Sequence, residues 1–468
     1  MQQKMMELRP ELSRLYAVSL QGEDVPVYHT AEADYAILVV CDDAPQRVQV
    51  RIRENFERLV IRPLKERDYT LENGTLTLTM RAGDKWSVEL DGDLIRPLFL
   101  LCSRYIPKPA DANHVFAAGT VTFIGDMELT SGDTVYLEAG AIVHGSFRAD
   151  HAEGITITGN GLLVGSLLHE PEPAPRRLMM RFLACQNVQV SGVTLVDGPC
   201  WHVVPIACRQ VTVRDVNIIT LKMCGDGIDV VGSEDVLIEG CFIRTNDDCI
   251  VVKANRYDDP MGCKDARNIL ARDCVLWNAK CGNAMEIGYE TSCTEICDVT
   301  FEHIAVIHCQ LEGWQSGGVF TIHNGDRGHV HRIQYRHITV EDAQEKLVDF
   351  KILCSKYSVD LQRGQISDIA FEHIHVVEGP FPPSIIRGYE SELAEKHVVS
   401  DIRFRDFKVH GTPVTDRLSA RMILEMCQDV TFSSKSGYSI IPCEKCRGFF
   451  SFRNCLPYSD KYHIIYCI

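Results

Sequence analysis

Three short clusters of acidic and polar residues lie close together in the middle of the 468-residue chain. They span Gly225–Asp229 (GDGID), Asn246–Ile250 (NDDCI) and Gly282–Glu286 (GNAME). Carboxylates that are held together repel one another, so a protein that gathers them usually uses them for chemistry. A carboxylate pair can supply a general acid and a general base. Cleavage of a glycosidic bond is the reaction that this pattern favours.

A repeat runs through the part of the chain that carries these clusters. The pattern V/I-x-h-x-x-h-x-h, with h an apolar residue, starts ten times between Ile155 and Val430, at intervals of 23 to 36 residues. Each unit offers a short alternating strand, a turn and a second strand, without the 3.6-residue stripe of a helix. One unit cannot bury its apolar face alone, whereas stacked coils share a core. The repeat predicts an all-β fold, a right-handed parallel β-helix. Leucine-rich repeats and propeller blades fit the pattern less well.

The repeat predicts that the three clusters come together in space. Asp226 follows the start of its unit by 15 residues, Asp247 by 11 and Asn283 by 14. Neighbouring strands of a sheet lie about 4.8 Å apart, so we expect these side chains on adjacent rungs of one sheet. Consecutive strand residues point to opposite faces, so Asp247 and Asp248 can share one surface only at a bend or a bulge. His303, His337 and His373 also recur at one strand position, which predicts a structural ladder and not a metal site.

The first hundred residues follow a different pattern. Alternating runs at 35–40, 48–53, 59–63, 69–72, 76–81 and 86–90 are separated by turn sequences. This pattern predicts a small N-terminal antiparallel β-sandwich at residues 1–110, followed by a β-helix catalytic domain at 111–468. We expect the sandwich to cap the open end of the β-helix, where edge strands would otherwise be exposed.

Composition restricts the partners and the compartment. The chain is 45% hydrophobic and 24% charged, with a net charge of −16, which disfavours nucleic acid and anionic membranes as partners. The N-terminus shows no apolar signal-peptide region, and no apolar run reaches membrane-spanning length. The 20 cysteines are therefore expected to be reduced, and the protein to be cytoplasmic. The single CxxC pair, Cys443 and Cys446, does not make a zinc site by itself. We expect no cofactor and no metal, while a homo-oligomer stays possible.

The stretch that begins GPCWHVVPIACRQVTVRDVNII and runs on to NDDCIVVKA resembles the core of the polygalacturonase-type glycoside hydrolases of family 28. Members of this family are right-handed parallel β-helices that hydrolyse with inversion. Cys224–Gly227 stands at the family's Asn-Thr-Asp-Gly motif, and Asp247–Asp248 stands at its Asp-Asp motif. The resemblance implies that Asp247 is the general acid, and that Asp226 and Asp248 hold and deprotonate the attacking water.

Two departures from the family pattern concern the substrate. Gly282–Ala284 replaces a Gly-His-Gly motif, and Gly313–Phe320 carries no cation where an Arg-Ile-Lys motif would grip a galacturonate carboxylate. The sandwich and the segment Met285–Glu290 also resemble family 49, the dextranases and isopullulanases, which act on neutral α-glucans. We therefore expect hydrolysis of α-glycosidic bonds in a neutral oligosaccharide. A polygalacturonase that acts on pectic oligosaccharides is the alternative, which cations from other coils (Lys346, Lys351, Arg387) would favour.

Nine residues near the aspartates are candidates for contact with the carbohydrate substrate. The aromatic rings suit stacking on a sugar, the histidines suit hydroxyl groups, and the carboxylates suit hydroxyl donors. Lys253 either pairs with a catalytic carboxylate or is solvated. The nine are Trp201, His202, Lys253, Asn283, Glu286, Tyr289, Glu290, Trp314 and His323.

Two other functions remain open on the sequence alone. A polysaccharide lyase of the same fold would use a basic residue, often with Ca²⁺ bound by carboxylates, and would form an unsaturated product that absorbs ultraviolet light. A noncatalytic carbohydrate-binding β-helix would bind sugar without turnover and would not need three adjacent aspartates.

Overall fold

The computed structural model describes residues 9–168, 177–254, 264–310, 317–391 and 395–434. Within these ranges the secondary structure consists of strands and turns, without an α-helix. No helix in this part of the chain is long and apolar enough to cross a membrane. The cysteines in the same ranges are free thiols, in agreement with the expected reduced state, whereas Cys443 and Cys446 lie outside the described residues.

The N-terminal part is a sandwich of two five-stranded sheets. The first sheet contains, in spatial order, β2 (Glu23–Val25), β1 (Tyr16–Leu20), β5 (Gln46–Ile52), β8 (Thr75–Met80) and β7 (Tyr69–Glu72). The second contains β3 (Val27–His29), β4 (Asp34–Val40), β10 (Leu98–Arg104), β9 (Lys85–Leu90) and β6 (Leu59–Arg62). The pairing is antiparallel except between β4 and β10, which run parallel. These two strands are far apart in sequence, so no short turn forces them to run antiparallel.

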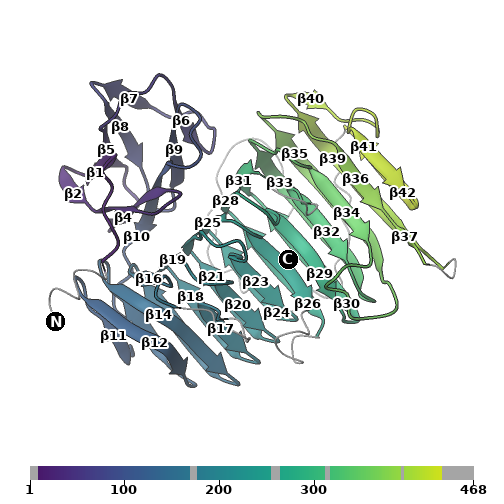
Figure 1. Cartoon of the computed structure of the whole chain (residues 1–468), viewed down its shortest axis with the longest axis horizontal. Helices are drawn as coiled ribbons and strands as arrows, with labels where there is room; N and C mark the ends of the chain where they lie inside the picture. Colours follow the sequence, from purple (N-terminus) through teal and green to yellow (C-terminus); the bar gives the residue numbers. More distant parts are fainter. Residues whose placement is uncertain (1–8, 169–176, 255–263, 311–316, 392–394, 435–468) are drawn as a thin grey trace, which may run out of the picture. The chain divides into compact units, whose positions relative to one another are not determined.

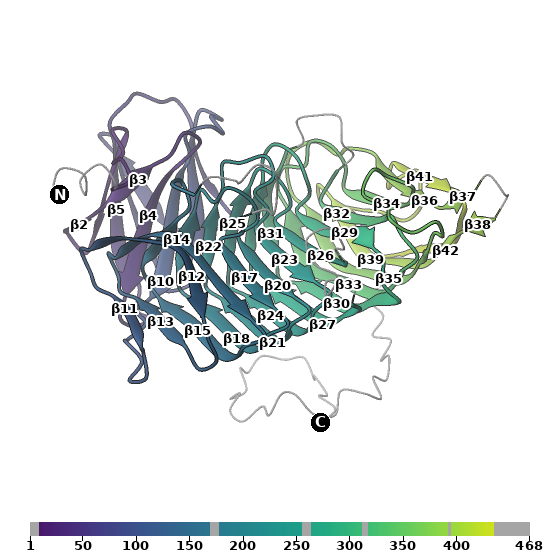
Figure 2. The same cartoon turned by 60° about the horizontal axis from the view of Figure 1, so that its bottom comes forward.

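The rest of the described chain is a right-handed parallel β-helix, whose coils follow one another in sequence order (Figures 1 and 2). The coils begin with β11 (His114–Phe116), β12 (Val121–Leu129), β13 (Thr134–Leu137) and β14 (Ile142–Asp150). Face 1 then contains β17 (Met180–Leu183), β20 (Val203–Ile206), β23 (Ile228–Val231), β26 (Ile250–Ala254), β29 (Met285–Thr291), β32 (Phe320–Asn324), β34 (Val348–Ile352), β36 (Ser384–Arg387) and β41 (Met422–Glu425).

Two further faces complete each coil. Face 2 contains β15 (Glu153–Gly159), β18 (Gln186–Ser191), β21 (Arg209–Arg214), β24 (Glu234–Glu239), β27 (Ala266–Arg272), β30 (Glu295–Glu302), β33 (His329–Val340), β35 (Gln365–Val376), β39 (Val399–Val409) and β42 (Cys427–Ser433). Face 3 contains β16 (Leu162–Val164), β19 (Thr194–Val196), β22 (Asn217–Ile219), β25 (Phe242–Thr245), β28 (Val275–Asn278) and β31 (Ala305–Cys309). Short pairs involve β37 (Tyr389–Glu390) with β38 (Lys396–His397), and β40 (Thr412–Pro413) with β39.

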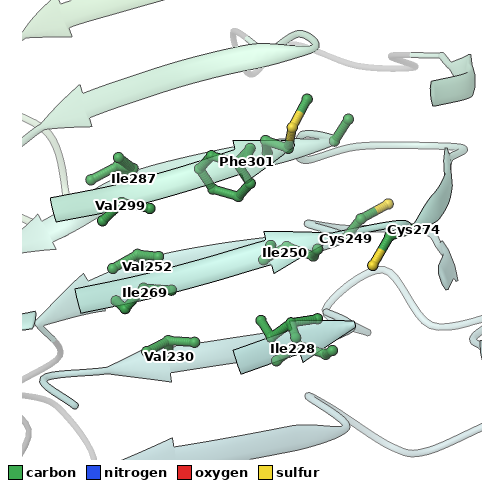
Figure 3. Close-up of a cluster of buried hydrophobic side chains, with 14 of the residues drawn as sticks. Ile228, Val230, Cys249, Ile250, Val252, Ile269, Cys274, Ile287, Val299 and Phe301 are labelled. Atoms are coloured by element: carbon green, nitrogen blue, oxygen red, sulfur yellow. The ribbon is translucent and has the colours of Figure 1, made fainter. Parts of the chain in front are cut away.

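The apolar residues of the repeat form the interior of the coils. On face 1, Val230 pairs with Val252, which pairs with Ile287, so one inward position is apolar on three successive coils. Figure 3 shows Val252 and Ile287 together with Ile269 and Val299 from face 2. Because strand residues alternate, the position beside this apolar column points outward on face 1. The repeat therefore sets both the core and the outward row that carries polar residues.

Two ladders of stacked rings confirm the register of the repeat. Tyr335, Phe371 and Phe404 stack in the core, with ring centroids 4.9 and 4.6 Å apart. His303, His337 and His373 form the expected structural ladder, with centroids 4.8 and 4.7 Å apart. Ring stacking of this kind requires the same strand position on each coil.

The sandwich packs against the outer side of face 3. Phe99 of β10 contacts Phe242 of β25 and Trp277 of β28, with centroid distances of 4.8 and 5.5 Å. The same apolar cluster includes Val164 and Ile307, which lie on earlier and later coils. The expectation of a cap over the open end was therefore wrong in its placement. Face 3 presents large apolar side chains outward, and the sandwich buries them. The division into domains at residues 110 and 111 stays a prediction.

Candidate active site

The acidic clusters lie where the chain turns from face 3 into face 1. Asp226 precedes β23, Asp248 precedes β26 and Asn283 precedes β29. Backbone hydrogen bonds join these turns: Gly227 N donates to Asp248 O (2.8 Å), and Cys249 N donates to Asn283 O (2.8 Å). The three clusters are thus neighbours on successive coils, as the repeat predicts. Asp247 and Asp248 lie in a bend before β26, so both remain partly exposed.

The backbone of Asp247 is held from two sides. Thr245 Oγ1 and Asn278 Nδ2 both donate to the Asp247 carbonyl oxygen, at 2.6 and 2.7 Å. Gly282, on the next coil, has a φ of +73°, and a Cβ at this position would come within 2.5 Å of the Asp247 carbonyl carbon and the Asp248 nitrogen. The close approach of the two turns therefore requires glycine at position 282.

Asp226 is buried beside a cation and has one oxygen without a hydrogen-bond donor. Lys253 Nζ lies 3.4 Å from Asp226 Oδ2, and His202 Nδ1 donates to the Asp226 carbonyl oxygen at 2.9 Å. Among the described residues, no protein group donates a hydrogen bond to Asp226 Oδ1. A buried acceptor without a partner is costly, and a bound water molecule would satisfy it.

Lys253 is the central cation of the site. Its Nζ lies 2.7 Å from Asp229 Oδ1 and 3.8 Å from the centre of the Trp201 ring. Burial alone would lower the pKa of Lys253, but the charges of Asp229 and Asp226 raise it well above its usual value. The ammonium group therefore stays charged and favours the ionised form of Asp226.

Crowding of the carboxylates raises the pKa of all three aspartates. For Asp247, burial is the largest cause and the charge of Asp229 adds to it, while Lys253 opposes them, so that its pKa is about 7. Burial also raises the pKa of Asp226 and Asp248 well above the usual range, with added repulsion from neighbouring carboxylates. The ionisation of each carboxyl group therefore depends on the charge of the other two. Asp226 and Asp248 each have a partner that favours ionisation, namely Lys253 and the Asn283 amide (2.8 Å).

A second group of charges extends along face 1. His323 Nδ1 lies 3.0 Å from Glu286 Oε1, and His323 Nε2 lies 3.4 Å from Asp349 Oδ2. Burial alone would lower the pKa of His323, but Glu286 and Asp349 raise it to about 9, so the ring is a cation at neutral pH. Lys351 Nζ lies 2.8 Å from Asp349 Oδ1, and Lys351 is in register with His323. The Tyr289 ring stacks on His323 with centroids 4.4 Å apart.

The cations that the sequence named on later coils do reach this part of the protein. Lys346 Nζ lies 3.8 Å from Asp349 Oδ2, next to the Lys351 contact with the same residue. Arg387 is in register with Lys351 and pairs with Glu425 at 2.6 Å. A basic row therefore follows the acidic turns along the outer side of face 1.

The structure changes the interpretation of several candidate binding residues. His202 and His323 are fully buried, and Glu286 is too, so none of them is exposed for contact with sugar hydroxyls. Both ring nitrogens of His202 bond to backbone, because Nε2 accepts from Gly198 N at 3.1 Å, and burial lowers its pKa to about 4. Trp201 is also buried, with Lys253 over its ring, so it supports Lys253 instead of offering an open stacking face.

The remaining candidates lie at the site or outside the described residues. Asn283 holds Asp248 and also accepts from Gly318 N at 3.0 Å. Tyr289 and Glu290 are partly exposed, and the charge of Glu290 acts on Lys253. Trp314 lies outside the described residues.

Two residues of the site had no role in the inverting mechanism or in substrate binding predicted from the sequence, although Asp229 belongs to the first acidic cluster. Asp229 binds Lys253, and Asp349 links His323 to Lys351. The alternation in VDFKI was a usable signal for Asp349, because it places Asp349 and Lys351 on the same outward side as Glu286 and Thr321. The signal for Asp229 was its place one residue after Ile228, which faces the core.

Comparison with known proteins agrees with this fold and identifies the family. The model of glycosyl hydrolases family 28 matches residues 110–377, which is more than half of the chain. The chain therefore belongs to family 28 of the glycosyl hydrolases, and the predicted family and enzyme class are confirmed. Among solved structures, the exopolygalacturonase of Thermotoga maritima superposes with a TM-score of 0.53 at 17% identity, covering 68% of this chain and 83% of that one. Dex49A from Penicillium minioluteum gives 0.60 at 13% identity, covering 89% and 95%. Identities this low show the fold alone.

Curated relatives are similar over shorter stretches. A probable polygalacturonase of Arabidopsis thaliana is 28% identical over 200 residues, which are 42% of this chain and 40% of that protein. A probable exopolygalacturonase B of Neosartorya fischeri is 21% identical over 287 residues (55% and 59%). A probable rhamnogalacturonase A of Aspergillus oryzae is 23% identical over 228 residues (46% and 44%). The chain spans less than two thirds of the length of each of these relatives.

Proposed function

We propose that the protein is an inverting glycoside hydrolase in which Asp247 is the general acid and Asp226 and Asp248 activate the attacking water. The observation that carries this proposal is the unpartnered Asp226 Oδ1, buried beside two further carboxylates on the next coil. A water molecule bound to Asp226 Oδ1 would be positioned and deprotonated by Asp226 and Asp248, whose ionised forms are favoured by Lys253 and by the Asn283 amide against the effect of burial. Asp247, with a pKa of about 7 and partial exposure, is suited to donate a proton to the leaving oxygen.

Inversion follows from these roles. One carboxylic acid protonates the leaving group while the base activates water on the opposite side of the sugar ring, without a covalent intermediate. Proton NMR of the first product tests this step, since it distinguishes the inverted from the retained anomer before mutarotation. A retained anomer, or a trapped glycosyl-enzyme, would contradict the proposal and would point to a nucleophilic carboxylate.

For the substrate, we favour an α-linked oligosaccharide that contains galacturonate over the neutral oligosaccharide expected from the sequence. Lys351 on β34 offers a cation in place of those missing from Gly313–Phe320, and it lies in register with His323, which is protonated but buried. An anionic sugar can pair with cations of this kind. The names of the relatives, polygalacturonases and a rhamnogalacturonase, point in the same direction.

A neutral α-linked oligosaccharide remains the second candidate for one specific reason. Lys253, His323 and Lys351 are each already paired with carboxylates of the protein, so their charge is partly neutralised. A screen of galacturonate oligomers against neutral α-glucosides decides between the two substrates. Release of galacturonic acid supports the first, and turnover of the neutral compounds alone supports the second. An ultraviolet-absorbing product would indicate a lyase instead. The cytoplasmic location and a homo-oligomeric state stay predictions.

A further inference from the structure

One carboxylate of the N-terminal sandwich reaches the turns that carry the acidic residues. Glu32 lies between β3 and β4, in a turn closed by a hydrogen bond from Thr30 N to Ala33 O (2.9 Å). Its Oε2 lies 2.6 Å from Arg244 Nη2 and 3.1 Å from Asn246 Nδ2, and its Oε1 pairs with Lys280. These partners are more than 200 residues away in sequence. They belong to the two coils whose turns hold Asp247 and Gly282.

Two of the residues that bind Glu32 also donate hydrogen bonds to the backbone around the site. Arg244, buried on β25, donates through Nη1 to Thr220 O (2.6 Å) and to Asn246 Oδ1 (2.8 Å). Asn246 Nδ2 also donates to Leu221 O at 3.0 Å. Thr220 and Leu221 lead into the turn of Asp226, and Asn246 directly precedes Asp247. A single side chain therefore connects the segments before Asp226, Asp247 and Asn283.

The burial of Glu32 and Arg244 distinguishes this contact from an ordinary surface ion pair. The Arg244 side chain is 3% exposed and that of Glu32 is 15% exposed. Burial alone would raise the pKa of Glu32, but the hydrogen bond from Lys280 and the charge of Arg244 lower it, so Glu32 is ionised at neutral pH. Loss of the Glu32 charge would leave a buried guanidinium without its carboxylate, which is strongly unfavourable.

We infer that Glu32 is a positioning residue, through which the N-terminal sandwich fixes the turn that carries Asp247 against the turn that carries Asp226. The inference rests on the proposed function of these aspartates. Hydrolysis requires the acid and the water-activating carboxylates to keep a defined separation. A displacement of about 1 Å between such groups can lower the rate by about two orders of magnitude.

Kinetics of Glu32→Gln test this inference. We expect kcat to fall about 10- to 100-fold with KM changed less than about threefold, because the substrate contacts remain while the acid is misplaced. We also expect the alkaline limb of the kcat–pH profile to move to lower pH, because a looser turn admits water to Asp247 and weakens the burial that raises its pKa. Glu32→Asp, which keeps the charge on a shorter side chain, should recover part of the loss.

The matched control is a second carboxylate at the junction of the sandwich and the β-helix. Glu89 pairs with Arg62 (3.2 Å) and with His308 (3.0 Å), away from the acidic turns. Glu89→Gln should lower the unfolding temperature but leave kcat and the pH profile within about twofold of wild type. An equal loss of kcat in Glu89→Gln would overturn the inference, since general loosening of the sandwich would then explain both variants.

A second variant covers failure of Glu32→Gln to fold. In Glu32→Gln with Arg244→Met no buried guanidinium is left unpaired, so circular dichroism should show a folded protein with the same loss of kcat. Wild-type kcat and pH profile in either folded variant would refute the role of Glu32. The result stays separate from the proposed function, because an inactive Asp247→Asn together with a fully active Glu32→Gln would refute only the positioning role.

Discussion

Replacement of Asp247 by asparagine should remove activity and increase stability at the same time. Asparagine keeps the size of the side chain but has no acidic proton to transfer to the leaving oxygen. General acid catalysis contributes roughly 10²–10⁴ in rate, so kcat on a substrate with a poor leaving group should fall at least about 100-fold. A substrate with a good leaving group should lose much less, because its departure needs little protonation.

The gain in stability follows from the pKa of Asp247. The carboxyl group ionises near 3.8 in the unfolded chain and near 7 in the folded protein, which corresponds to about 4 kcal/mol against folding above pH 7. Because Asp247 is partly exposed, water reduces this cost, and we expect about 1–2 kcal/mol. The folded state binds the proton more tightly, so wild-type stability falls as pH rises between these two values, and the asparagine variant escapes that fall.

Urea unfolding of both proteins from pH 4 to pH 8 measures the effect. The variant should match wild type near pH 4 and exceed it by a constant amount above about pH 7. Asp24→Asn, an exposed carboxylate on β2, is the control and should change neither activity nor stability. A variant that is less stable than wild type at pH 8, or that keeps more than about a tenth of wild-type turnover, would refute the assigned role of Asp247.

Four further predictions concern the glycine contact, the cations and the core. Gly282→Ala should lower kcat at least about tenfold and destabilise the fold by roughly 1–3 kcal/mol, because its Cβ would clash with the turn that carries Asp247. The control is Gly132→Ala, which has a similar φ of +82° but open space around the added Cβ, and which should keep full activity. Steady-state kinetics and thermal unfolding compare the two variants. Lys351→Met should raise KM for galacturonate oligomers at least about tenfold with little change for a neutral substrate, and an unchanged KM would argue against cation recognition; exposed Lys396→Met is its control. The same KM should rise in wild type as pH increases through about 9, where His323 loses its proton. Phe371→Ala should destabilise by about 3–5 kcal/mol, measured by urea unfolding, because its buried ring stacks between those of Tyr335 and Phe404.

The sequence alone was sufficient for the fold class and for the neighbourhood of the aspartates. A β-helix repeats one pattern of inward apolar residues, so Val230, Val252 and Ile287 can be aligned with one another from the residue pattern by itself. The same alignment placed Asp226 beside the Asp247–Asp248 pair, because stacked coils bring equivalent positions within one strand spacing. Strands β4 to β9 of the sandwich were also predicted close to their observed bounds from alternation and turn residues.

The tertiary structure determined which candidate side chains are accessible to a substrate and which only hold other side chains in place. His202, Glu286 and His323 have the residue types of sugar-binding groups, yet they are fully buried and bound to protein partners. Their partners lie on neighbouring coils, and alternation along a single strand does not report contacts between coils. The register that places Lys351 beside His323 likewise depends on the number of residues between the two strands.

The contact of Glu32 with Arg244 lay furthest from sequence-based prediction. It joins positions 212 residues apart and requires the sandwich to pack on the outer side of face 3, where Phe99 meets Phe242 and Trp277. Local patterns predict an element and its inward face. How two separately formed elements pack depends on the shape and charge of whole surfaces, which only the assembled chain brings together.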